Sequence, residues 1–164
     1  MYLVKVMSYY ETTYGEIVDT THLYQIIENH GSISCKEMYF YDFGSGYGNI
    51  VLQFQNKFQQ SIGIELVKDR YDHAVKQNKF SNVNFIWENF FHIFLQNPCV
   101  ILVNNLCLGT GTNKRLGCKL LNEMKSNDIL MVTKKIKSLE LYYITYYNIQ
   151  CSWGPSELYV YKIE

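Results

Sequence analysis

Gly44, Gly46 and Gly48 alternate in the stretch DFGSGYGN, which leads from an apolar run into a helix-like run. Glycine lets the backbone turn sharply and pass close to a ligand, so such a stretch often holds a nucleotide. The dinucleotide fingerprint GxGxxG needs a glycine where this chain has Asn49. Asp42 also puts a carboxylate beside the turn, where it would repel a pyrophosphate and attract a cation. The pattern favours a nucleoside that carries a cationic amino-acid group.

Polar side chains also end the next two apolar runs. Glu65 closes SIGIEL, and a carboxylate there can accept hydrogen bonds from both ribose hydroxyls of an adenosine. Asn89 and Phe90 follow VNFIW, where an amide can meet the adenine amino group and a ring can stack on it. The carboxyl ends of parallel strands share one crevice, so this layout predicts an S-adenosyl-L-methionine site. Glycine turns and strand-end acids are also common as plain turns and helix caps.

Apolar runs and helical patterns alternate along most of the chain. Five runs rich in β-branched and aromatic residues are expected to be buried parallel strands, at 38–43, 61–66, 83–87, 99–106 and 128–133. Helices are expected at 16–29, 49–58, 69–79 and 114–125, and two closing strands at 140–153 and 157–164 around a turn at 154–156. The pattern predicts one α/β domain over residues 1–164. It is a Rossmann-like sheet of five parallel strands with a C-terminal antiparallel hairpin and helices on both faces.

Composition narrows the class of protein. The 164 residues are 48% hydrophobic and 18% charged, as expected of a globular domain with one core. No apolar run approaches the ~20 residues of a membrane span. Five cysteines without a CxxC pair predict reduced thiols in a nuclear or cytoplasmic protein, and the four histidines show no metal-ligand spacing with them. Equal numbers of basic and acidic residues, 15 each, argue against a domain that grips nucleic acid by bulk charge.

The fourth expected strand ends in VNNLCLG, where the reacting methyl group should lie. Methyltransferases that act on bases or glutamines often carry Asn/Asp-Pro-Pro-aromatic at this point. Here Asn104 and Asn105 are followed by Leu106 and Cys107, which supply neither proline nor a ring. This end of the strand argues against a nucleic-acid base as the acceptor.

Five stretches together resemble the disruptor-of-telomeric-silencing (DOT) family of histone lysine methyltransferases. They are YYETTYGEIVD, DFGSGYGNIVLQ, GIELVKDRYDHA, VNNLCLG and CSWGPSELYVYKIE, in family order from residue 9 to residue 164. The second is similar almost position by position to the family's Asp-Leu-Gly-Ser-Gly-Val-Gly-Gln-Val-Val-Leu-Gln. The resemblance implies S-adenosylmethionine as cofactor and methyl transfer to a histone lysine. The family default is the core-face lysine of histone three, and a histone-four tail lysine or another basic protein is the alternative.

The resemblance also implies roles for individual residues. Glu11, Thr12 and Thr13, within a cofactor-covering segment at 1–15, would contact the methionine end of the cofactor. The rest of the cofactor site would be Asp42, Gly44, Gly46, Asn49, Glu65, Asn89, Phe90 and Asn104. The catalytic channel for the target lysine would be Asn104, Trp153 and Tyr159.

The sequence departs from the family at several of these points. Tyr10 replaces a glycine of the cofactor loop, and Asn89 replaces an aspartate and so brings no charge. The segment after Trp153 is two residues shorter than in the family, which leaves the assignment of Tyr159 open by one position. In a strand, such a slip reverses the face on which a side chain lies.

The expected partner is a histone or nucleosome, bound by a monomer. Eukaryotic family members carry a long helical region before the cofactor loop and basic segments that hold nucleosomal DNA, and this chain shows neither. Weak contacts with DNA or an acidic surface are expected from Arg70, Arg115, Lys134, Lys135 and Lys137.

The sequence leaves alternatives open for the origin of the protein and for its function. A minimal catalytic domain of this family, rich in tyrosine and asparagine, suggests a viral protein, which would act in the host nucleus or a viral factory. An RNA or small-molecule methyltransferase stays open as another function, as does a cofactor-binding partner without catalysis.

Overall fold

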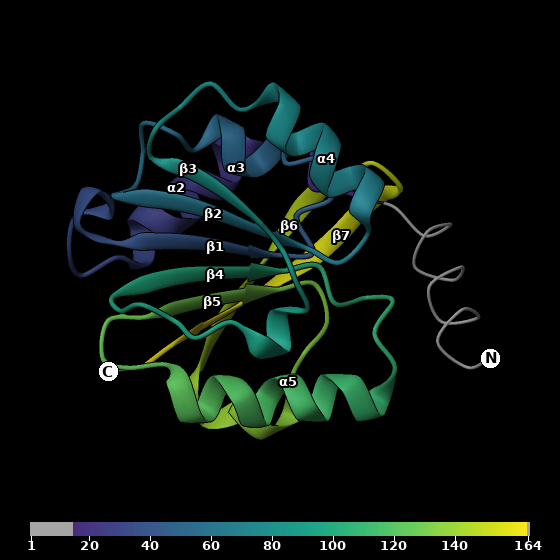
Figure 1. The fold of residues 1–164 in the computed structure, drawn as a ribbon. Coiled ribbons are helices and arrows are strands. Elements are labelled where there is room, and N and C mark those ends of the chain that lie inside the picture. The colour runs from purple at the N-terminus through teal and green to yellow at the C-terminus, as the bar shows by residue number, and fades with distance from the viewer. Residues whose placement is uncertain (1–14, 164) are drawn as a thin grey trace.

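The computed structural model describes residues 15–163 (Figure 1). Its helices are α2 (Thr20–His30), α3 (Asn49–Gln53), α4 (Lys68–Gln77) and α5 (Thr110–Glu123), with 3-10 helices η1 (Cys35–Glu37), η2 (Phe90–His92) and η3 (Lys137–Tyr142). Its strands are β1 (Tyr39–Phe43), β2 (Gln60–Glu65), β3 (Val83–Trp87), β4 (Cys99–Val103), β5 (Ile129–Val132), β6 (Tyr143–Cys151) and β7 (Gly154–Lys162).

The strands of the described residues form one seven-stranded sheet in the order β3-β2-β1-β4-β5-β7-β6. Strands β1 to β5 run parallel, and β7 runs antiparallel to its neighbours β5 and β6. Central parallel strands are covered on both faces, which is why a run such as CVILV in β4 is apolar and buried at every position. The predicted parallel sheet with a closing antiparallel hairpin is confirmed.

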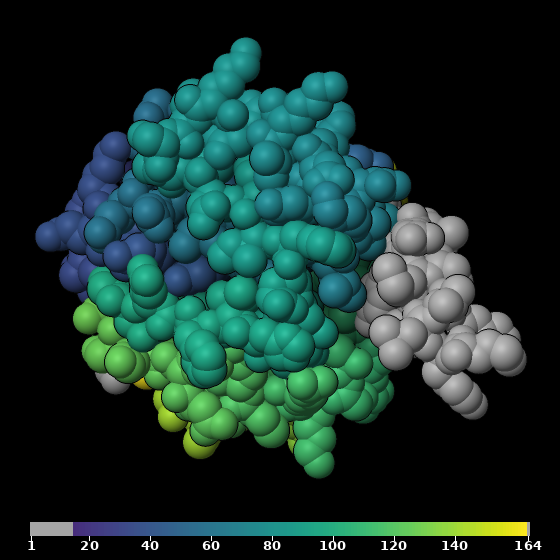
Figure 2. Space-filling model, in the orientation of Figure 1, coloured from purple at the N-terminus to yellow at the C-terminus, as the bar shows by residue number. Residues whose placement is uncertain are grey.

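Helices cover both faces of this sheet (Figure 1). On one face, here called the α2 face, α2, α3 and α4 bury residues such as Ile26, Val51 and Ala74. On the other, the α5 face, α5 and η3 bury residues such as Leu116 and Leu139. The segment between β3 and β4 also lies over the α5 face, and the space-filling view shows it directly against α5 (Figure 2).

The first helix begins later than its sequence pattern predicts. Helical spacing extends over residues 16–29, but α2 starts at Thr20, where the Asp19 side chain caps it. Ile17 instead forms an antiparallel bridge with Cys151 at the end of β6. Pairing with a distant strand therefore overrides the local helical pattern.

The predicted hairpin turn is wrong by two residues. Residues 154–156 belong to β7, and the loop consists of Ser152 and Trp153, because Cys151 pairs directly with Gly154. Gly154 has a φ of 121°, a conformation that favours glycine and permits so tight a connection. This register puts Trp153 at the tip of the hairpin.

Other boundaries differ by smaller amounts. Helix α5 begins at Thr110 rather than at residue 114, immediately after Gly109. Helix α3 ends at Gln53, five residues before the predicted end. Strand β4 ends at Val103, so the two asparagines that follow it lie just beyond the sheet.

Candidate functional site

The glycine turn joins β1 to α3 at the carboxyl edge of the sheet. Gly44, Gly46 and Gly48 have φ angles of 85°, 55° and 83°, which residues with a side chain rarely adopt. A Cβ on Gly48 would lie 2.5 Å from the ring of Phe85. The backbone N–H of Gly44 donates to the carbonyl of Ile64 at 2.8 Å, which fastens the turn to β2. The alternating glycines are therefore required by the shape of the turn.

Glu65 supports this turn from the end of β2. Its Oε2 accepts a hydrogen bond from the backbone N–H of Gly46, and its Oε1 accepts one from the N–H of Val67, each at 2.8 Å. The side chain is buried. A carboxylate oxygen has more than one lone pair, so Glu65 can hold the turn and still accept from a ribose hydroxyl.

Asp42 lies beside the turn and is only 5% exposed. Burial, followed by the charges of Glu65 and Glu16, raises the pKa of its carboxyl to about 7. Nearby carboxylates disfavour one another's ionisation, and a cation placed among them would favour it. The electrostatics of this edge suit a positively charged ligand.

Glu16 is a site residue that the sequence reasoning missed. Its Oε2 accepts a hydrogen bond from Nδ2 of Asn49 at 2.8 Å, which joins the chain near residue 16 to the first turn of α3. Its charge also acts on Asp42. The signal was the acid in the stretch YYETTYGEIVD, next to the proposed cofactor-covering segment. The predicted contacts of Glu11, Thr12 and Thr13 lie outside the described residues.

Asn89 and Phe90 follow β3 as predicted, and both make contacts within the protein. Asn89 caps η2, because its Oδ1 accepts from the backbone N–H of Phe91 at 3.0 Å. The ring of Phe90 stacks on Phe43, with centroids 5.1 Å apart and planes within 8° of parallel. An adenine bound at this point would contact the Asn89 amide and the Phe90 ring, which already contact other groups of the protein.

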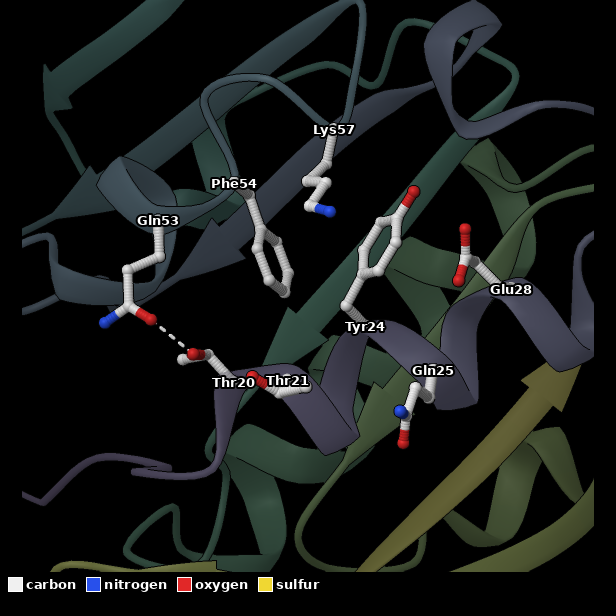
Figure 3. Close-up of a pocket in the computed structure, with 8 residues that line it drawn as sticks. All are labelled: Thr20, Thr21, Tyr24, Gln25, Glu28, Gln53, Phe54 and Lys57. Atoms are coloured by element: carbon white, nitrogen blue, oxygen red, sulfur yellow. Dashed lines mark hydrogen bonds between the residues drawn. The ribbon is translucent and has the colours of Figure 1, made fainter.

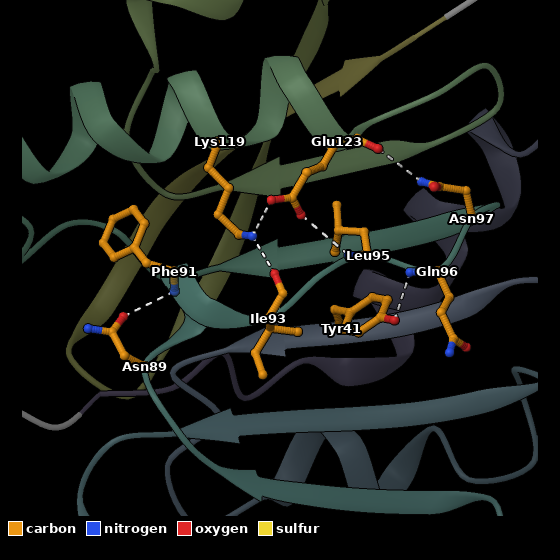
Figure 4. Close-up of polar contacts among 9 residues, drawn as sticks. All are labelled: Tyr41, Asn89, Phe91, Ile93, Leu95, Gln96, Asn97, Lys119 and Glu123. Atoms are coloured by element: carbon orange, nitrogen blue, oxygen red, sulfur yellow. Dashed lines mark hydrogen bonds and ion pairs between the residues drawn. The ribbon is translucent and has the colours of Figure 1, made fainter.

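Polar contacts hold the segment after β3 against α5 (Figure 4). Lys119 pairs with Glu123 at 2.6 Å, and its side chain is only 7% exposed. The same ammonium donates to the carbonyl of Ile93, while the N–H of Leu95 donates to the Glu123 carboxylate at 3.3 Å. These bonds fix the part of the chain that follows Asn89 and Phe90.

Asn104 and Trp153 are far apart in the sequence but meet through Gly15. Nδ2 of Asn104 donates to the carbonyl of Gly15 at 3.0 Å. A Cβ on Gly15 would lie 2.5 Å from Cε3 of Trp153, so the indole lies directly against this glycine. The N–H of Ser152 donates to the carbonyl of Glu16 at 2.8 Å. Two of the three residues predicted for the lysine channel are thus brought together, and Trp153 remains 44% exposed.

Tyr159 lies further along β7, where it pairs with Val132 at the end of β5. Its ring packs on the α5 face, whereas Leu158 and Cys151 of the same hairpin pack on the α2 face. Its hydroxyl donates to Glu157, and this bond, together with burial, raises the pKa of Tyr159 to about 12. Since side chains alternate along a strand, the one-residue ambiguity seen in the sequence decides the face, and Tyr159 lies on the α5 face.

The basic residues predicted to meet outside partners differ in exposure. Arg70 is buried in α4, which does not fit the predicted contact. Arg115 and Lys135 each lie over an aromatic ring of the protein, 4.1 Å and 4.7 Å from the ring centroids. Lys134 and Lys137 are exposed, as are Arg115 and Lys135.

An open cavity of about 370 Å³ lies between α2 and the end of α3 (Figure 3). A hydrogen bond from Thr20 to Gln53 crosses it, and the ammonium of Lys57 lies 4.4 Å from the ring centroid of Tyr24. It is lined by none of the predicted site residues and lies at the opposite end of α3 from the glycine turn. It is separate from the acid-lined edge.

Within residues 15–163, no helix is both long and apolar enough to cross a membrane. In the same part of the chain, no three His, Cys, Asp or Glu side chains are grouped so that they could hold a metal ion.

Solved structures share this fold at low sequence identity. An RNA methyltransferase from Salinibacter ruber, in complex with S-adenosyl-L-homocysteine, has a TM-score of 0.65 and 18% identity over 85% of this chain and 90% of that one. The N-methyltransferase NodS from Bradyrhizobium japonicum WM9 has a TM-score of 0.71 and 10% identity over 88% and 94%. Magnesium protoporphyrin IX methyltransferase from Synechocystis PCC 6803, with bound S-adenosylmethionine, has a TM-score of 0.70 and 10% identity over 88% and 78%.

These neighbours support S-adenosylmethionine as the predicted cofactor. No curated protein matches the chain in sequence. Residues 2–82 match the family described as histone methylation protein DOT1. That match contains the glycine turn and Glu65 and ends before Asn89, Asn104 and Trp153. The chain therefore has the class I S-adenosylmethionine-dependent methyltransferase fold, and its residues 2–82 are similar to the DOT1 histone methylation family.

Proposed function

We propose that this protein transfers a methyl group from S-adenosylmethionine to a histone lysine on the nucleosome, in a nuclear setting. The core-face lysine of histone three is the family default, and a histone-four tail lysine is the alternative. The observation that carries the proposal is the acid-lined edge built by Asp42, Glu65 and Glu16, which lies wholly within the family match at residues 2–82.

The residues of this acid-lined edge, which we call the donor edge, fit a sulfonium nucleoside. Asp42 has a raised pKa because it is buried among acids, and a cationic methionine moiety would favour its ionised form. Glu65 is held in place by two backbone N–H groups and keeps lone pairs for a ribose. The bound cofactor would supply an already activated methyl group. The protein's work is therefore to align donor and acceptor and to exclude water.

The acceptor lysine must arrive as a neutral amine. At pH 7 this costs about 4–5 kcal/mol, because the reference pKa of lysine is about 10.4. An aromatic channel disfavours the charged form by desolvation, so no dedicated general base is required. We propose that Trp153 provides this desolvation and that Asn104 helps to orient the amine. The assignment of Tyr159 to the channel remains a prediction, and its ring lies on the α5 face of the hairpin.

Incubation with labelled S-adenosylmethionine tests the proposal. Nucleosomes, free histones and total RNA are offered in parallel, and labelled protein is mapped by mass spectrometry. Label on a histone lysine is the expected result. Label on RNA alone would favour the RNA alternative, and tight cofactor binding without any label would favour a non-catalytic partner.

The matched variants are Asp42→Ala and Lys134→Ala. Asp42→Ala should abolish both cofactor binding and labelling, whereas Lys134→Ala changes an exposed side chain and should leave cofactor binding unchanged. Retained cofactor binding in Asp42→Ala would mean that the donor site has been misplaced.

A further inference from the structure

The carboxamide of Asn104 is bound at both of its polar atoms. Nδ2 donates to the carbonyl of Gly15 at 3.0 Å, and Oδ1 accepts from the hydroxyl of Thr133 at 2.9 Å. Thr133 is 3% exposed and follows the last residue of β5. An inverted amide would set its oxygen against the Gly15 carbonyl oxygen, which repels it. The two partners therefore determine which way the side chain faces.

The hydroxyl of Thr133 is itself oriented by the backbone. It accepts a hydrogen bond from the N–H of Asn105 at 3.0 Å, so its own proton is free to donate elsewhere. The oxygen of Asn104 lies 2.9 Å away, while the side-chain oxygen of Asn105 lies at 3.4 Å and already accepts from the N–H of Lys134. The shorter distance favours donation to Asn104.

Asn104 in turn holds the segment Gly15–Glu16, which connects the tip of the hairpin to the donor edge. Its partner Gly15 lies against the indole of Trp153. The next residue, Glu16, donates its N–H to Oγ of Ser152 at 3.1 Å and reaches the donor edge through its bond with Asn49. A shift of Asn104 would therefore be felt at Gly15 and at the hairpin tip.

We propose that Thr133 is a positioning residue for methyl transfer. It acts through Asn104 to hold Gly15 and Trp153 where the acceptor lysine must pass. This inference rests on the proposed function, because it assigns a residue to the acceptor side of the same site. Nothing in the sequence singles out Thr133, which falls in the run DILMVTKK.

The first test compares Thr133→Val, Thr133→Ser and Asn113→Ala. Thr133→Val removes the hydroxyl at constant shape, Thr133→Ser keeps it, and Asn113→Ala removes a different bond to Asn105 without touching Asn104. Both Thr133→Val and Asn113→Ala should lower the melting temperature, since each disturbs a buried hydrogen-bond network. Only Thr133→Val should lower kcat, by about tenfold, as expected for one lost hydrogen bond felt in the transition state. Thr133→Ser should restore kcat.

A double-mutant cycle shows whether Thr133 acts through Asn104. If it does, adding Thr133→Val to Asn104→Ala should change kcat by less than about twofold, because coupled residues are not additive. A full tenfold further loss in the double variant would overturn the proposal. An equal loss of kcat in Asn113→Ala would also overturn it, since the effect would then belong to the general stability of the network.

A second readout needs no catalysis. The chain has two tryptophans, so Trp87→Phe leaves Trp153 as the single fluorophore. In that background Thr133→Val should increase acrylamide quenching of Trp153, whereas Thr133→Ser and Asn113→Ala should not. If the wild type labelled no substrate, the proposed function would fail, yet this measurement would still test the positioning. Unchanged quenching in Thr133→Val would overturn the proposed role.

Discussion

The donor edge and the proposed acceptor side, where Gly15, Asn104, Thr133 and Trp153 meet, are assembled in different ways. At the donor edge, Glu65 holds the turn at Gly46, which lies 19 residues away in the sequence. On the acceptor side, Asn104 holds Gly15 across 89 residues, and Glu16 bonds Ser152 across 136. Apart from Glu16, the donor edge is thus a local structure between consecutive strands. The acceptor side depends on the first described residues meeting the end of the chain.

This difference predicts that variants on the two sides will affect different steps, either cofactor binding or methyl transfer to the lysine. Changes at the donor edge should weaken cofactor binding itself. Changes on the acceptor side should leave cofactor affinity nearly intact and affect the use of the lysine substrate.

The largest effect is expected from Glu65→Ala. It removes two charge-assisted bonds to the backbone and the ribose acceptor, so cofactor affinity should fall by about 100-fold or more. Calorimetric titration with S-adenosylmethionine measures it. Glu140→Ala, at an exposed acid of η3, serves as the control and should bind normally. Normal binding by Glu65→Ala would contradict the assigned donor edge.

A smaller effect is expected from Trp153→Ala. Loss of the indole exposes the lysine path to water, and we expect kcat/KM for the histone substrate to fall by about 30-fold through lost desolvation. Cofactor affinity should change by less than about threefold, because the indole lies on the acceptor side. Trp87→Ala, at the other exposed tryptophan, should not change the KM for histone. If Trp153→Ala weakened the cofactor as much as the histone, the two sides would not be separable.

The pH dependence of cofactor binding sharpens the comparison at the donor edge. The pKa of Asp42 is about 7 in the unliganded protein, and a bound cation favours the ionised form. Binding should release a proton below pH 7, and affinity should be about tenfold weaker at pH 6 than at pH 8. Titrations in buffers of different ionisation heat measure the proton directly. Asp42→Asn should remove the pH dependence, and a variant that kept it would point to another group.

The same raised pKa has a consequence for stability. The folded value of about 7 lies above the ordinary value of 3.8, so the folded state holds the proton more tightly. The contribution of Asp42 to the free energy of unfolding is complete below pH 3.8 and is lost as the pH rises through 7. Melting temperatures of the wild type and Asp42→Asn should therefore diverge over this range.

The smallest effect is expected from Tyr159→Phe. The change removes the hydroxyl bond to Glu157 on the α5 face and leaves the ring packing intact. Activity should change by less than about twofold, as is usual for a surface-side hydrogen bond. Steady-state kinetics on nucleosomes measures it. A large loss of kcat would instead support the role in the lysine channel that the family resemblance implies.

Much of the fold could be predicted because its signals are local. Continuous apolar runs indicated the five parallel strands, and the alternating glycines with Asp42 indicated the turn at their carboxyl edge. Glu65 was found in the same way, since it ends a strand next to that turn.

The errors have a common physical cause. Residues 16–19 have helical spacing, yet Ile17 pairs with Cys151 at the far end of the chain. The turn at 154–156 was suggested by glycine and proline, but strand pairing moved the loop to Ser152 and Trp153. The local preference for a helix or a turn is overridden where pairing with a distant strand provides hydrogen bonds and burial.

The sequence by itself determined the class of fold and the donor chemistry, because continuous apolar runs, a glycine turn and the acids beside it lie within short stretches. Only the tertiary structure decided the acceptor side. The meeting of Gly15, Asn104 and Trp153, the support from Thr133 and the face of Tyr159 all depend on strand register and long-range pairing. A shift of one residue in that register reverses a side chain's face, and no local pattern in the chain sets it.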